Sequence, residues 1–170
     1  IDFRYYKGLH KNVITDLFGG KYYVDSYNRK TVLAENSLNG GNAAWVNQKL
    51  GVGDVIRRDY DGFVMYEGGF AQLEYNKDKV SAFVSGGLTN TSYWRKDRFY
   101  YSGDKQVSSK EHYLGGNVKA GLNYNLDDHN NVFANAGFIS RAPIFDNTFI
   151  NSQSSHERNA DAKNEKVYSF

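Results

Sequence analysis

Apolar and polar positions alternate along several stretches of this chain, most clearly in residues 79–90 (KVSAFVSGGLTN). A period of two residues is typical of a β-strand that has one apolar and one polar face. Its apolar face consists of Val80, Ala82, Val84, Gly86 and Leu88. Its polar face consists of Lys79, Ser81, Ser85 and Thr89, with Phe83 as the exception. The pattern therefore predicts a strand over these residues.

The same period recurs in residues 112–126 (HYLGGNVKAGLNYNL), 63–75 and 132–140. The apolar faces of the first and last of these carry Leu114, Val118, Ala120, Leu122, Tyr124, Leu126, Val132, Ala134, Ala136 and Phe138. In residues 63–75, Glu67 falls on the apolar side and weakens the pattern. Residues 1–6 and 165–170 look like partial strands. We therefore expect an all-β, antiparallel up-and-down meander of about six strands.

The connections alternate in length. Residues 76–79 (NKDK) and 127–131 (DDHNN) are short and rich in turn formers, whereas about 7–53, 96–110 and 141–164 are long. The strands also exceed the mean of roughly 5 to 6 residues, and a tilted membrane strand needs about 9 to 11. Long strands with alternating tight turns and extended loops are typical of an outer-membrane barrel.

Composition and aromatic placement fit this reading. The mean hydropathy is −0.67, and no apolar run approaches the roughly 18 to 20 residues of a membrane helix, which excludes a helical membrane protein. Aromatic residues make up 16% of the chain. Tyr75 and Tyr124 lie beside the short turns, and Trp94 lies at the other end of the same apolar face, as in an interfacial girdle. The single proline, Pro143, follows the point at which a strand would leave the membrane.

Charge and chemistry exclude other classes. The net charge of +2 comes from scattered residues, so nucleic acid is not an expected partner. There is no cysteine, and His10, His112, His129 and His156 lack ligand spacing, so we expect neither a metal nor a cofactor. Asp127 and Asp128 lie in a turn, glycine pairs such as Gly86–Gly87 suit strand kinks, and no catalytic motif is present. We therefore expect no enzymatic activity.

Three segments resemble parts of TonB-dependent outer-membrane receptors. These are IDFRYYKGLHKNVITDLFGGKYY at the start, GFAQLEYNKDKVSAFVSGGLTNTSYWRKDRF (69–99), and NVFANAGFISRAPIFDNTFIN (131–151) with NADAKNEKVYSF (159–170). The resemblance covers nearly the whole chain. It implies a transmembrane barrel of about 22 strands that encloses a plug, in the outer membrane of a Gram-negative bacterium.

The resemblance also implies a function in nutrient uptake. Residues 1–170 would form a partial barrel domain, and both ends look like cuts through a longer chain. Implied partners are outer-membrane lipid, an imported small-molecule or glycan ligand, and the TonB system through N-terminal parts that have no match here. Open sheet edges would favour self-association. The alternative is a soluble β-sandwich for adhesion or ligand binding, with its apolar faces packed together.

Two sets of site residues follow. The stretch TSYWRKDRFYYSGDK (91–105) interleaves rings and cations that suit a sugar or chelate, or else an interfacial girdle beside charged head groups. Its candidate ligand contacts are Trp94, Arg95, Arg98, Tyr100 and Tyr101, with Trp45 in a separate loop. The expected membrane-facing residues are Val80, Val84, Leu88, Leu114, Val118, Leu122, Tyr124, Val132 and Phe138.

Overall fold

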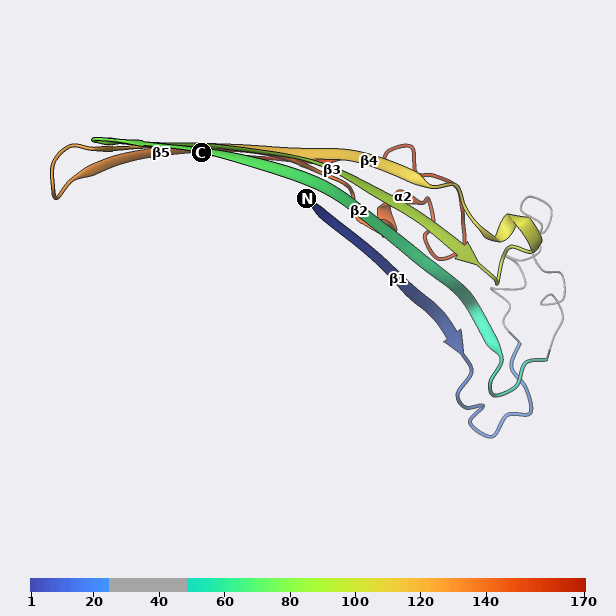
Figure 1. Cartoon of the computed structure of the whole chain (residues 1–170). Helices are drawn as coiled ribbons and strands as arrows, with labels where there is room; N and C mark the ends of the chain where they lie inside the picture. The colour runs from blue at the N-terminus through green and yellow to red at the C-terminus, as the bar shows by residue number, and fades with distance from the viewer. Residues whose placement is uncertain (25–48) are drawn as a thin grey trace.

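The computed structural model describes residues 1–24 and 49–170, which form one antiparallel sheet with its six strands in chain order (Figure 1). The strands are β1 (Asp2–Val13), β2 (Val55–Lys77), β3 (Val80–Asp97), β4 (Glu111–Asn125), β5 (Asn131–Arg141) and β6 (Glu165–Ser169). A 3-10 helix, η2 (Gly103–Gln106), and a one-turn helix, α2 (Phe145–Thr148), lie in the loops. The predicted all-β meander is confirmed, and the sheet is not closed. No helix in the described ranges is long and apolar enough to cross a bilayer.

The two short connections lie at one end of the sheet and the long loops at the other (Figure 1). The β2–β3 turn contains Asp78 in a left-handed conformation, with φ of 50°. In the β4–β5 turn, the carboxylate of Asp127 accepts hydrogen bonds from the backbone N–H groups of His129 and Asn130. Such bonds from Asp to its own turn explain why these residues reverse the chain.

The predicted strand ends were wrong at the long-loop end. β1 continues to Val13, β2 begins at Val55, and β3 continues to Asp97, so the connection after β1 begins at residue 14, and the later loops are 98–110 and 142–164. The predicted loop start at residue 7 is too early, because β1 pairs with β2 through Lys11↔Asp59. Charged residues such as Lys7, Asp61 and Lys96 interrupt the apolar face in these extensions, so backbone pairing continues where the hydrophobic pattern is broken.

The register joins the apolar positions of four strands, β2 to β5, into one continuous surface, here called the apolar face. One row runs Leu73↔Val84↔Ala120↔Ala136, and the next runs Tyr75↔Ala82↔Leu122↔Ala134. Of the residues expected to face a membrane, Val84, Leu88, Leu114, Val118, Leu122, Tyr124 and Val132 are exposed, and Val80 and Phe138 are partly buried. Leu88 and Leu114 are 70% and 73% exposed, so nothing in the described residues covers this face.

The other side of the sheet is the polar face, and the two clusters of buried hydrophobic residues lie there, beneath the loops. Tyr93, Tyr113 and Ala162 form one cluster, against which Phe145 of α2 packs. Phe99, Tyr100 and Tyr101 form a second cluster at the end of β3. The core therefore lies between loops and one end of the sheet, and not between two layers of sheet.

Candidate ligand-binding site

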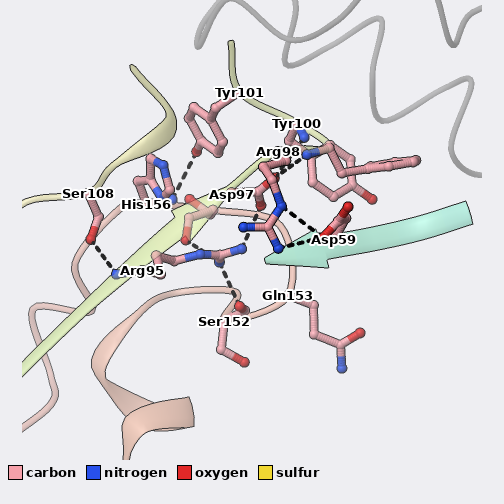
Figure 2. Close-up of polar contacts among 12 residues, drawn as sticks. Asp59, Arg95, Asp97, Arg98, Tyr100, Tyr101, Ser108, Ser152, Gln153 and His156 are labelled. Atoms are coloured by element: carbon pink, nitrogen blue, oxygen red, sulfur yellow. Dashed lines mark hydrogen bonds and ion pairs between the residues drawn. The ribbon is translucent and has the colours of Figure 1, made fainter. Parts of the chain in front are cut away.

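Arg95 and Asp97 form a buried ion pair on the polar face of β3 (Figure 2). They lie two residues apart and so point to the same side of the strand. The Arg95 Nη2 to Asp97 Oδ2 distance is 2.6 Å, and both side chains are 0% exposed. The guanidinium also lies 4.3 Å from the ring centroid of Tyr60. A charged pair this deep needs further polar partners to offset its desolvation.

The loops supply these partners. Arg95 Nη1 donates to the backbone carbonyl oxygens of Ser152 at 2.6 Å and Ser155 at 2.8 Å. The Oδ1 atom of Asp97 accepts from the backbone N–H groups of Phe99 and Tyr100, at 2.8 and 2.9 Å. The pair therefore fastens loop 142–164 to the sheet and shapes the turn that begins loop 98–110.

His156 joins these two loops to each other. Its ring stacks on Tyr101 with centroids 3.7 Å apart, and its backbone N–H donates to the Tyr101 hydroxyl at 2.9 Å (Figure 2). Nε2 lies 3.1 Å from the carbonyl oxygens of Lys105 and Gln106. Burial, followed by the charge of Arg95, lowers the pKa of His156 to about 4. The ring is therefore neutral at pH 7, with the proton on Nε2, where both acceptors lie.

Arg98 binds two carboxylates on the opposite side of the sheet. Its Nη2 lies 2.6 Å from Asp59 Oδ1, and its Nη1 lies 2.8 Å from Asp61 Oδ2. The hydrogen bonds that Arg98 donates to Asp61, and then those to Asp59, raise the pKa of Arg98. Arg98 thus ties the end of β3 to β2, and its charge is already balanced there.

An open cleft of about 530 Å³ lies among the loops, lined by Arg57, Tyr100, Asn151, Gln153 and Ser154. This volume lies within the roughly 300 to 1,000 Å³ of small-molecule sites. Arg57 occupies an irregularity in β2, where the register shifts, and has φ of 66°. A bulge with a left-handed non-glycine residue re-aims a side chain, and such strain is concentrated at binding sites. Amide, hydroxyl and guanidinium groups in the lining suit a polar ligand.

The structure does not gather the predicted ligand contacts on one surface. Arg95, Tyr100 and Tyr101 are 0%, 1% and 4% exposed and hold the loops together, and of these Tyr100 lines the cleft. Trp94 points to the apolar face and stacks on Phe63. Trp45 lies outside the described residues. Arg57 was missed in the sequence analysis, because no sequence pattern indicates its backbone conformation. The polar run NSQSS (151–155) was also missed, although its residue types are those expected to bind a polar ligand.

No metal site is apparent from the side chains that the structure describes, since nowhere in residues 1–24 and 49–170 do three His, Asp or Glu converge. Comparison with protein-family models, curated proteins and solved structures yields no match to this chain.

Proposed function

We propose that this chain is part of the transmembrane barrel of a TonB-dependent nutrient receptor in an outer membrane. The observation that carries the proposal is the exposed apolar face. In β4 it extends from Leu114 to Tyr124, which at about 3.3 Å per residue and a tilt near 40° is about 25 Å in height. This equals the apolar band of outer-membrane barrels, about 25 Å. A soluble sheet would have to cover the same face with a second layer.

Aromatic residues at the short-turn limit of this face, and beyond its Leu114 limit toward the long loops, support the proposal. Tyr75 and Tyr124 lie at the short-turn end. At the other end the rings of Tyr5, Phe63 and Trp94 form a cluster, with centroid distances of 5.1 to 6.4 Å. Amphipathic rings prefer the level of the lipid head groups, so two aromatic belts match the two membrane interfaces.

The sheet edges support a larger barrel. β1 pairs with β2 as far as Gly68, and β6 pairs with β5 from Gly137 to Arg141. Among the described residues nothing pairs with the outer edges of 69–77 and 131–136. Unpaired backbone groups in lipid cost several kcal/mol each, so neighbouring strands must pair there. We propose that further strands of the same barrel pair with these edges. When those strands are absent, we expect the edges to pair with a second copy of the chain.

The barrel is tested by single-cysteine labelling, for which a chain without cysteine is well suited. Leu114, Val118 and Leu122 are each changed to Cys, as are Asn117, Lys119 and Asn123 on the polar face. A spin label is attached to each variant in lipid vesicles, and collisions with oxygen and with a water-soluble nickel complex are measured. Spin labels at the even positions should collide more often with oxygen, and labels at the odd positions should collide more often with the nickel complex. Equal accessibility, or a stable detergent-free monomer with both faces protected, would support a soluble sandwich and end the proposal.

We propose that the cleft beside Tyr100 contacts the imported ligand, because hydrogen-bonding groups line it and because it lies among the loops. A hydroxyl-rich small molecule or glycan matches these groups. Binding to a glycan array would be compared for the parent chain, Gln153→Ala and the matched control Gln72→Ala, which lies on the polar face away from the loops. Loss of glycan binding in the first variant alone supports the assignment. Equal loss in both contradicts it.

A further inference from the structure

The apolar face changes character in steps toward the long loops. Above Leu88, the next row on this face pairs Glu67 with Asn90 and Asn90 with Leu114, and Asn90 Nδ2 donates to Glu67 Oε2 at 3.1 Å. The next row places Ser92 Oγ at 2.9 Å from Nδ1 of His112. The aromatic cluster of Tyr5, Phe63 and Trp94 follows. The order along the strands is therefore aliphatic, polar, then aromatic.

Cations lie at and beyond the aromatic cluster, on the same face. Lys110 Nζ lies 4.7 Å from the Trp94 ring centroid, and Lys7 Nζ lies 5.7 Å from that of Phe63. Lys96 lies two residue pairs further along, in the next row of the same face, opposite Asp61, and is exposed. We call Lys7, Lys96 and Lys110 the basic rim. Lysine stems pack along apolar surface while the ammonium groups remain in water, which places a charge at a membrane interface.

The rim has positive charge in excess on these rows of the sheet. Lys11 and Arg98 share the carboxylates of Asp59 and Asp61 with Lys7. Among the residues that the structure describes on these rows, five cations (Lys7, Lys11, Lys96, Arg98 and Lys110) stand against the carboxylates of Asp59 and Asp61, which leaves three positive charges in excess. Lys7 remains 53% exposed despite its 3.2 Å contact with Asp61 Oδ2. An anion that approaches this surface therefore meets ammonium groups whose charge the described residues of these rows do not fully neutralise.

We propose that the basic rim binds the phosphate groups of an anionic lipid headgroup in the membrane leaflet on the long-loop side. This inference rests on the proposed function. Continuity with the apolar face identifies the source of the phosphate, because a lipid that lies against the aliphatic and aromatic rows brings its headgroup to the rim. A soluble anion would gain nothing from those rows.

The test compares lipid binding to the chain in detergent by native mass spectrometry. Phosphatidic acid, which carries a phosphomonoester, is titrated against zwitterionic phosphatidylcholine. The rim variant combines Lys7→Gln, Lys96→Gln and Lys110→Gln. The matched control removes the same charge elsewhere, through Lys77→Gln, Lys79→Gln and Lys119→Gln. The rim variant should bind phosphatidic acid about 100-fold more weakly, at roughly fivefold per lysine, and the control should change little.

Equal affinities of the two variants would overturn the proposal. So would full competition by millimolar inorganic phosphate, because the site would then recognise a soluble anion. The alternation of oxygen and nickel accessibility along β4, measured with spin labels on the same variants, separates the basic-rim proposal from the barrel proposal. Alternation that persists while headgroup preference is absent overturns the rim alone, whereas loss of alternation in the parent chain overturns the barrel.

Discussion

Acidification should release loop 142–164 from loop 98–110 through protonation of His156. The ring is neutral in the packed structure, where Nε2 donates toward the carbonyls of Lys105 and Gln106. A second proton on Nδ1 would create a cation in a site that already contains the Arg95 guanidinium. Nδ1 has no hydrogen-bond partner in this packing, so the new charge would also lack compensation.

The free energy that acidification removes from the loop packing follows from the pKa of His156, which the packed loops lower from 6.5 to about 4. When the loops separate, the ring regains its ordinary pKa, so the open state binds the proton more tightly. The packing therefore has its full stability above pH 6.5 and loses it as the pH falls from 6.5 to about 4. The full difference corresponds to about 3 kcal/mol. The ring is partly exposed, so screening reduces this to about 1 to 2 kcal/mol.

Hydrogen exchange of the loop peptides measures this opening. After correction for the intrinsic rate, protection of the His156 backbone N–H, which donates to Tyr101 at 2.9 Å, should fall about 5- to 30-fold between pH 7 and pH 4. The control is His156→Gln, whose amide keeps a donor for the two carbonyls but does not titrate. If the parent and this variant lose protection equally over that range, His156 is not the titrating group and the reasoning is refuted.

Two further changes test the packing. Arg95→Met leaves Asp97 buried without its partner, which should cost about 3 to 5 kcal/mol and appear as faster hydrogen exchange in loop 142–164; unchanged exchange would mean that the pair does not hold the loop. Gly115→Ala would place a Cβ 2.6 Å from the Ser140 carbonyl oxygen, whereas Gly69→Ala meets nothing within 4 Å. Urea unfolding in detergent should show a loss of about 1 to 3 kcal/mol for the first and about 0.5 kcal/mol or less for the second, and equal losses would contradict the close approach of β4 and β5.

The strand pattern could be predicted wherever one face is aliphatic and the other polar. Residues 79–90 and 112–126 meet this condition, and the structure has strands there. The prediction fails between Leu88 and the long loops. There the apolar face carries Glu67 and then Lys96, and the loops cover the polar face. Alternation between oil-like and polar side chains disappears there, although the backbone ladder continues. That is why the strand ends were placed too early.

The loop contacts could not be predicted, because they depend on groups that carry no sequence signal. Arg95 Nη1 is satisfied by backbone carbonyls of Ser152 and Ser155, 57 and 60 residues away. Every residue has such a carbonyl, so only the folded path of the loop determines which ones reach the guanidinium. The spacing of Arg95 and Asp97 by two residues on one strand was the available hint that they form a pair.

The stretch 91–99 illustrates why a mixture of rings and cations can be misread as one binding patch. In β3 the odd positions Tyr93, Arg95 and Asp97 lie on the polar face under the loops, where Tyr93 donates to the Pro143 carbonyl at 2.7 Å. The even positions Trp94 and Lys96 lie on the apolar face. A strand of period two therefore separates them into a loop anchor and a candidate headgroup site. Substitutions at odd positions should change loop protection and leave lipid preference intact, and substitutions at even positions should do the reverse.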